Sequence, residues 1–245
     1  MNNFNSQQKA WEKEYQEPAF ISLHDKPQSE VMKFAQWLKK DGAAYLGKNI
    51  LQDPDRVEPL RLLDLGCGNG RNLVYFTENY HAEGWGIDFS PTAIAHARSN
   101  KNDLRITYTV ASIGDDAAYA SFQDNSFDII MDITASNALY EGERDIYLRE
   151  AFRTLKPGGI MMVRSLCLDA DKNAKNLLQM SPGPESGMYI LPDQLIAEKV
   201  FGEEEFRDRY GEFFNIIELT KPSGYQRWAE QSFKRRYIVA YMQKK

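Results

Sequence analysis

The stretch from Leu62 to Asn72 constrains this chain more than any other, because an apolar run leads directly into three closely spaced glycines. These are Gly66, Gly68 and Gly70. Glycine adopts positive φ without a steric penalty, and it lets the backbone approach a ligand that any Cβ would displace. The stretch therefore predicts a strand, a tight turn able to hold a cofactor, and the start of a helix.

The spacing of the glycines separates two kinds of cofactor. Dinucleotide sites carry G-x-G-x-x-G, but the position of that third glycine is Arg71 here. The chain instead has G-x-G-x-G, with Asp64 two residues before the first glycine. This spacing and its leading acid resemble motif I of the class I S-adenosylmethionine (SAM) methyltransferases. A turn that merely connects two elements is the alternative, because short glycine motifs also arise by chance.

Three later segments resemble the same family in the same order. A second apolar segment ends at Asp88, where a carboxylate can accept hydrogen bonds from both hydroxyls of a ribose. An N-cap is the alternative for Asp88, but Ser90 already suits that position. The run from Ser126 to Ile130 resembles the entry to the family's fourth strand. The run from Arg149 to Gly159 resembles its helix, L-K-P-G-G turn and fifth strand.

The resemblance implies an α/β fold with a Rossmann-like, doubly wound, seven-stranded mixed sheet in a three-layer sandwich. The expected strand order is 3-2-1-4-5-7-6, with strand seven antiparallel. Strands six and seven are expected at 214–220 and 237–242. Residues 1–59 are expected to form an N-terminal helical cap, which includes an amphipathic helix from Ser29. Residues 60–245 are expected to form the methyltransferase domain, with an insertion at about 167–200.

The resemblance also implies the site, which would bind SAM and release S-adenosylhomocysteine. Asp132 and Asn137 stand at and after the end of strand four, beside the expected position of the methyl group, and are the candidate catalytic residues. Tyr15 belongs to an aromatic N-terminal segment expected to cover the cofactor and exclude water. The expected cofactor-binding residues are Asp64, Gly66, Cys67, Gly68, Asn69, Gly70, Asn72, Asp88, Phe89, Ser112, Ile113, Asp132, Ile133 and Tyr15.

Ser112 departs from the family pattern, because an acid that contacts the adenine amino group often stands there. A serine hydroxyl can still accept that hydrogen bond. The pair Asp115 and Asp116 is expected in a loop or helix cap, and no group of His, Cys or acidic residues has metal-ligand spacing, so no metal is expected. Methyl transfer needs a base only when the acceptor is protonated, and His24 is the one histidine considered for that role.

The acceptor is expected to be a small molecule that the motifs do not identify. The chain lacks the Asn-Pro-Pro-Tyr or Asp-Pro-Pro-Tyr sequence of adenine N6-methyltransferases. RNA or protein is the alternative acceptor, and the basic run 234–236 favours it. A third hypothesis is that the protein binds SAM without catalysing methyl transfer. The insertion from Cys167 to Tyr189 is expected to be a Pro/Gly-rich lid over the site, and a disordered surface insertion is the alternative. A loop over 221–228 is expected to offer Tyr225, Arg227 and Trp228 to the acceptor.

Composition excludes several classes of protein. The net charge of −5 over 245 residues disfavours a nucleic-acid footprint over the whole surface. No apolar run approaches the roughly 20 residues of a membrane helix, and the polar start predicts no signal peptide. Cys67 and Cys167 are therefore expected to be free thiols in a reducing cytoplasm. The sequence leaves the acceptor atom and the oligomeric state open.

Overall fold

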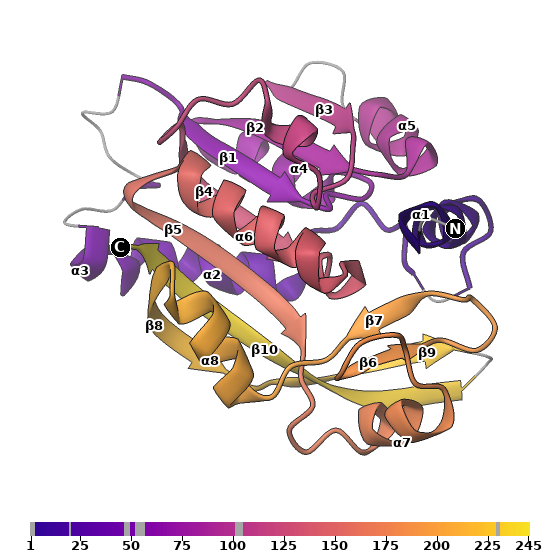
Figure 1. Ribbon diagram of the computed structural model, residues 1–245. Helices are drawn as coiled ribbons and strands as arrows, with labels where there is room; N and C mark the ends of the chain where they lie inside the picture. Colours follow the sequence, from indigo (N-terminus) through magenta and orange to yellow (C-terminus); the bar gives the residue numbers. More distant parts are fainter. Residues whose placement is uncertain (1–2, 20, 47–49, 52–56, 101–104, 229–230) are drawn as a thin grey trace.

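The computed structural model describes residues 3–19, 21–46, 50–51, 57–100, 105–228 and 231–245, and it places a central sheet between layers of helices (Figure 1). The strands of the main sheet are β1 (Leu60–Leu65), β2 (Ala82–Asp88), β3 (Ile106–Val110), β4 (Phe127–Ile133), β5 (Leu155–Leu166), β8 (Phe214–Thr220) and β10 (Gln231–Lys244). Their order in the sheet is β3-β2-β1-β4-β5-β10-β8, and β9 (Ser223–Trp228) pairs with β10 as an eighth strand that the sequence did not predict.

The sheet topology confirms the expected order and the antiparallel seventh strand. Strands β1 to β5 pair in parallel, whereas β10 runs antiparallel to both β5 and β8. Leu65 at the end of β1 therefore lies between Ile87 of β2 and Asp132 of β4. Because the carboxyl ends of these parallel strands meet at one edge of the sheet, the polar residues that follow each strand gather there.

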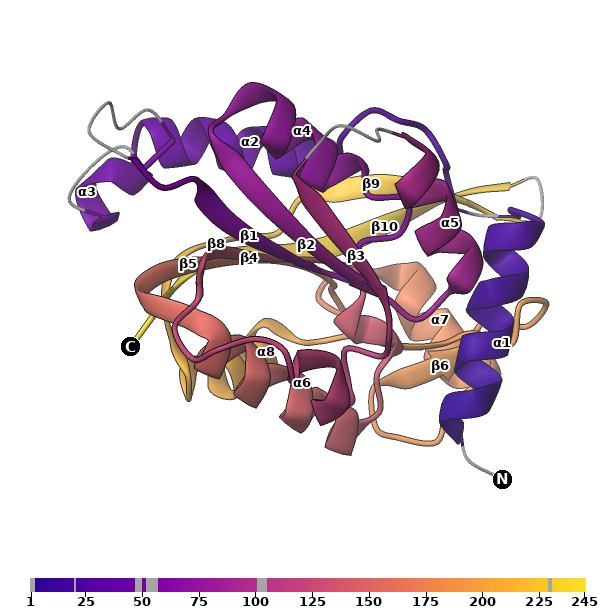
Figure 2. The same cartoon turned by 90° about the horizontal axis from the view of Figure 1, so that it is seen from above.

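Helices cover both faces of the sheet (Figure 2). One face carries α2 (Ser29–Lys39), α4 (Arg71–Asn79) and α5 (Pro91–Asn100), and the other carries α6 (Glu141–Thr154) and α8 (Glu203–Gly211). The shorter helical elements are α3 (Gly42–Leu46), η1 (Asp116–Tyr119) and η2 (Ser136–Ala138). None of the helices in the described part of the chain has the length and apolar character needed to span a bilayer.

The period-two alternation of the strands builds a separate apolar core on each face. Ile129 and Met131 of β4 pack with Phe34 of α2, whereas Ile130 packs with Tyr147 of α6. All five side chains are almost fully buried. Burial of one such side chain stabilises the fold by about 1.5–3 kcal/mol, so the two cores hold the carboxyl edge of the sheet rigidly in place.

Helix α1 (Asn3–Gln16) lies across the carboxyl edge of the sheet, close to α5 (Figure 1). Gln7 donates to the Ala197 carbonyl at 2.8 Å and accepts from the Ala197 amide at 3.0 Å. Nearer the other end of the helix, Glu12 accepts from the hydroxyls of Ser90 and Thr92, at 2.5 Å each. The helix therefore bridges α5 on one side and the segment around residue 197 on the other.

Two expected loops are regular structure. The insertion contains α7 (Lys172–Met180) and a two-stranded antiparallel sheet of β6 (Met188–Ile190) and β7 (Ala197–Lys199). The expected loop 221–228 is largely strand β9 (Ser223–Trp228), which pairs antiparallel with β10. Strand β10 consequently begins at Gln231 rather than at the expected Tyr237. Strand β9 and the start of β10 were missed because polar residues stand on both of their faces, which removes the alternation that marks a strand. Strands β6 and β7 have three residues each, which is too short for an alternation to be recognised.

Candidate active site

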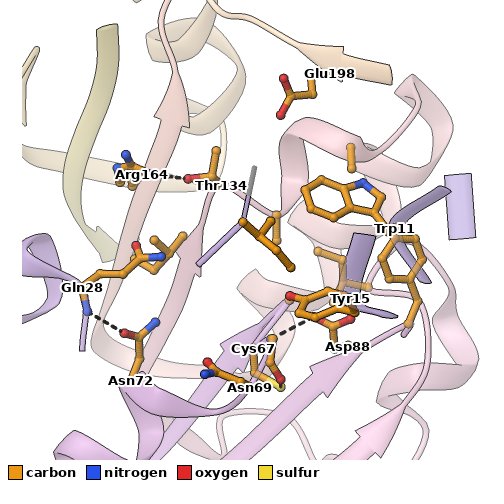
Figure 3. Close-up of a pocket in the computed structure, with 18 of the residues that line it drawn as sticks. Trp11, Tyr15, Gln28, Cys67, Asn69, Asn72, Asp88, Thr134, Arg164 and Glu198 are labelled. Carbon is orange, nitrogen blue, oxygen red and sulfur yellow. Dashed lines mark hydrogen bonds between the residues drawn. The ribbon is translucent and has the colours of Figure 1, made fainter. Parts of the chain in front are cut away.

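A cavity of about 540 Å³ opens at the carboxyl edge of the sheet, within the usual range of roughly 300–1,000 Å³ for ligand pockets. Its wall combines the glycine turn after β1, the ends of β2 and β4, Arg164 of β5, Tyr15 of α1 and Glu198 of β7. Figure 3 shows these side chains converging on the cavity from segments far apart in the sequence. The topology therefore assembles a single site from both the expected region and the insertion.

The glycine turn has the positive-φ backbone that its sequence predicts. Gly66, Gly68 and Gly70 have φ values of 75°, 55° and 76°. A Cβ on Gly66 would stand 2.1 Å from that of Ala135, and a Cβ on Gly68 would stand 2.7 Å from the Tyr15 hydroxyl. The turn leaves room for a ligand only as long as these positions lack side chains.

Asp88 lies in the cavity wall immediately beside the turn. Its carboxylate accepts from the Gly68 amide at 2.9 Å and from the Ser90 amide at 3.0 Å. Ser90 Oγ in turn accepts from the Ala93 amide at 3.0 Å and so caps α5, as the sequence suggested. Burial raises the pKa of Asp88 to about 6 despite these hydrogen bonds. The two backbone hydrogen bonds thus hold the Asp88 carboxylate in one position in the cavity wall.

Asp64 lies one layer behind the turn and does not line the cavity. Its side chain is 1% exposed, and Oδ2 has no hydrogen-bond partner in the described part of the chain. Burial, together with the neighbouring carboxylates of Asp132 and Asp88, raises the pKa of Asp64 to about 7. A buried carboxylate at this place favours a cationic ligand in the adjacent cavity.

The segment before α2 is tied onto the glycine turn. Asn69 Nδ2 donates to the Leu23 and His24 carbonyls at 3.4 and 3.3 Å, and Asn72 Oδ1 accepts from the Gln28 amide at 3.2 Å (Figure 3). Asn69 and Asn72 therefore hold the N-terminal cover as well as lining the cavity. The side chain of His24 is exposed and is not among the lining residues, which removes it as a candidate base.

Most of the remaining expected residues also lie in the wall. Tyr15, Cys67, Phe89, Ser112, Ile113 and Ile133 all line the cavity. The Ser112 hydroxyl accepts from the Gly114 amide at 3.1 Å and is 7% exposed. Gly70 does not line the cavity, because its role is to begin α4.

Asp132 and Asn137, the expected catalytic residues, make their contacts inside the protein. The Asp132 carboxylate is fully buried, accepting from the Ala135 amide at 2.8 Å and from the Tyr147 hydroxyl at 2.7 Å. Asn137 Nδ2 donates to Ser165 Oγ at 3.0 Å and is also bonded to the backbone of β7. Neither side chain lines the cavity. These contacts tie both side chains to the segment that follows β4, behind the wall of the cavity.

The half of the cavity farther from the glycine turn contains residues that the sequence did not single out. Arg164, Glu198, Gln226 and Tyr237 line it, together with the expected Tyr225. No local motif marks these positions, since they come from β5, β7 and the β9–β10 pair. Phe20 and the side chains of Arg227 and Trp228 lie outside the described residues. Among the described residues, no cluster of three potential metal ligands occurs.

A family model described as a methyltransferase domain matches residues 57–205, which include the glycine turn, Asp88 and Glu198. The chain belongs to this methyltransferase domain family. A relative, phosphoethanolamine N-methyltransferase 3 of Arabidopsis thaliana, is 26% identical over 75% of this chain and 37% of its own length. The tRNA N(3)-methylcytidine methyltransferase of Drosophila melanogaster is 27% identical over 77% of this chain and 57% of its own length.

Solved structures show the methyltransferase fold directly. The Burkholderia thailandensis 1,6-didemethyltoxoflavin-N1-methyltransferase, solved with S-adenosylhomocysteine bound, superposes with a TM-score of 0.64 at 15% identity. The match covers 99% of this chain and 88% of that chain. The chain therefore spans nearly the whole length of this structural neighbour, but only about a third of the plant relative.

Proposed function

We propose that this protein transfers the methyl group of SAM to a small-molecule acceptor. The observation that carries the proposal is a single cavity whose wall contains the glycine turn with Asp88 and Tyr15 and, away from the turn, the side chains of Arg164 and Glu198. SAM, when bound, supplies a methyl group already activated by its positive sulfur. The protein's part is therefore to bind, orient and exclude water rather than to provide a nucleophile of its own.

Each wall residue of the first half suits one part of SAM. The Asp88 carboxylate is placed to accept from ribose hydroxyls, and Ser112 and Ile113 lie where the base would extend. The buried carboxylate of Asp64, on the other side of the glycine turn, would attract the sulfonium and ammonium groups of SAM electrostatically. Tyr15 covers the turn and keeps water away from the reacting atoms. This assignment makes residues 60–245 the catalytic domain and residues 1–59 its cap.

A small acceptor fits the cavity better than RNA does. The acceptor half lies beneath α1 and the insertion, and Arg235 of the basic run is only 2% exposed because it pairs with Asp171 inside the protein. This leaves Lys234 as the exposed member of that run. The named acceptors of the relatives include phosphoethanolamine and 1,6-didemethyltoxoflavin, both small, as well as a tRNA cytidine. We place the protein in the cytoplasm, since both of its cysteines are unpaired.

Calorimetry with S-adenosylhomocysteine tests the cofactor half. Wild-type protein should bind it, and both Asp88→Ala and Gly68→Val should lose binding while their circular dichroism spectra stay unchanged. Transfer of a labelled methyl group to small-molecule, RNA and protein fractions of an extract then tests the acceptor. Label confined to the RNA or protein fraction contradicts a small acceptor. Failure of wild-type protein to bind at millimolar ligand contradicts the whole proposal, and binding without any product indicates a non-catalytic module.

A further inference from the structure

Two side chains of opposite charge line the acceptor half of the cavity, and the binding of SAM assigns them no role. They are Glu198 on β7 and Arg164 on β5. Figure 3 shows Arg164, Thr134 and Glu198 together on the side of the cavity away from Cys67, Asn69 and Asp88. Because both charges are built into the wall, the ligand that occupies this half must complement both.

The Glu198 carboxylate is held by a buried chain of hydrogen bonds. Its Oε2 accepts from the Tyr189 hydroxyl at 2.6 Å, and that hydroxyl accepts from Arg235 Nη2 at 2.8 Å. Arg235 Nε in turn lies 3.1 Å from the Asp171 carboxylate. Glu198 is 4% exposed, so it can hardly change position. These hydrogen-bonded side chains include two carboxylates and one guanidinium, so their net charge is −1 when both carboxylates are ionised.

No other basic side chain in the described part of the chain neutralises Glu198 by an ion pair. The adjacent Lys199 is directed elsewhere, with Nζ 2.6 Å from the Glu205 carboxylate and 2.8 Å from the Ser186 carbonyl. The charged or titratable groups that bear on Glu198 are Tyr189, Arg235 with its partner Asp171, and Arg164 in the same half of the cavity. Burial raises the pKa of Glu198, while Arg235 and the Tyr189 hydrogen bond oppose the rise. Such a carboxylate can bind an ammonium group or take a proton from it.

Arg164 is fixed just as firmly. Its Nη1 donates to Thr134 Oγ1 at 2.6 Å, and its guanidinium lies 3.5 Å from the centroid of the Tyr237 ring. Thr134 itself has a φ of 69°, which is rare for a β-branched residue, and its amide donates to the Arg164 carbonyl at 2.7 Å. Within the described residues no carboxylate pairs with Arg164, and its Nε has no partner. A guanidinium in this state is suited to a carboxylate or phosphate group of a ligand.

We propose that the acceptor is an aliphatic amine that also carries an anionic group, with Glu198 binding the amine and Arg164 binding the anion. This inference rests on the proposed methyltransferase function. The amine enters as an ammonium ion and gives one proton to Glu198. Its lone pair then forms the carbon–nitrogen bond to the methyl carbon while the carbon–sulfur bond breaks and its electron pair remains on sulfur. The product leaves as an N-methylammonium ion, and Glu198 returns its proton to water.

SAM itself ends in an amino group and a carboxylate, so the same chemistry has a second source. Calorimetry with S-adenosylhomocysteine separates the two sources. Glu198→Gln and Arg164→Gln should bind this product as wild-type protein does, within about twofold, and so should the exposed control Glu212→Gln. An affinity reduced about tenfold or more in either pocket variant assigns the charges to SAM and overturns the proposal. Loss of binding in wild-type protein would instead refute the proposed function beneath it.

Methyl transfer to a panel of acceptors tests the substrate class. The panel contains aliphatic amines ending in a carboxylate or a phosphate, the same compounds with the acid esterified, and the same compounds with the amine acetylated. We expect turnover of the amines that carry a free acid group. The esters should have a KM at least about tenfold higher, and the acetylated amines should not be methylated. Preference between carboxylate and phosphate then identifies the anion. Wild-type protein that binds S-adenosylhomocysteine but methylates no amine acid, or that methylates the amides, overturns the proposal.

The pH profile separates proton removal from a structural role of Glu198. Gln cannot take the proton, so Glu198→Gln should use only the neutral amine, whose fraction is ~10⁻³ at pH 7 for an alkylamine with a pKa near 10. Its kcat/KM should therefore rise about tenfold per pH unit between pH 7 and pH 9, whereas the wild-type value should stay nearly level. Glu198→Asp should recover part of the activity at pH 7. A variant that retains its circular dichroism spectrum and the wild-type pH profile would refute the role.

Discussion

Replacement of Asp64 by Asn should stabilise the ligand-free protein at pH 8 while weakening its affinity for SAM. The Asp64 side chain is buried, Oδ2 has no partner among the described residues, and the pKa is raised from 3.8 to about 7. The folded protein therefore holds this proton more tightly than the unfolded chain does. The stability linked to Asp64 is complete below about pH 4 and is lost as the pH rises through about 7.

The size of the effect follows from the rise in pKa. The change from 3.8 to about 7 spans roughly three pH units, and each is worth ~1.4 kcal/mol, so the ionised carboxylate costs up to ~4 kcal/mol at pH 8. Asn removes the charge but introduces an amide that must find an acceptor, which costs about 1–3 kcal/mol. A net gain of ~2 kcal/mol corresponds to an increase in Tm of about 4–8 °C for a chain of this size.

Thermal melts followed by circular dichroism between pH 4 and pH 8 measure this gain. The matched control is Asp128→Asn at the opposite end of the sheet, where the carboxylate accepts from the Arg61 amide and from Lys156 Nζ, at 2.9 Å each. The control should lower Tm at pH 8, because it removes a paired charge. A Tm difference between Asp64→Asn and wild type that is equal at pH 4 and pH 8 would refute the reasoning, as would a lower Tm at pH 8.

Three further perturbations test the cavity. In wild-type protein, the affinity for SAM measured by calorimetry should fall about tenfold per pH unit below the pKa of Asp88, which is about 6. An affinity that stays unchanged from pH 7 to pH 5 would contradict a role of Asp88 in binding SAM. Gly68→Ala should weaken binding about tenfold because its Cβ meets the Tyr15 hydroxyl; unchanged binding would show that Tyr15 can move aside. Gln7→Ala should speed hydrogen exchange in α1, since both bonds to Ala197 are lost, and unaltered exchange would show that other contacts hold this helix.

The cofactor half could be predicted from sequence because its determinants are local. Positive φ at Gly66 and Gly68 requires glycine whatever the rest of the chain does, and an acid at the end of a strand must appear at the carboxyl edge of the sheet. The expectation that Tyr15 covers the cofactor came instead from the resemblance to the family, and the structure places its hydroxyl beside Gly68. The same resemblance implied the strand order that the structure confirms.

The fate of the residues after β4 could not be predicted, because it depends on partners distant in the chain. Asp132 ends a strand just as Asp88 does, yet Tyr147 of α6 and the amide of Ala135 use its oxygens and remove it from the cavity. The burial of Arg235 could not be predicted for a similar reason. Alternation along β10 turns Arg235 inward to Asp171, a pairing that no pattern around residue 235 indicates.

The placement of the charges gives the two halves of the cavity different evolutionary freedom. In the SAM half, Asp88 and Tyr15 contact or lie against the glycine turn, so a substitution there disturbs the turn itself. In the acceptor half, Glu198 depends on a relay through Tyr189 and Arg235 to Asp171, and these residues come from α7 and its flanks, β6 and β10. A change at any one of them alters the field at the acceptor without touching the glycine turn. Specificity for the acceptor can therefore change by substitution in the insertion while the binding of SAM stays intact.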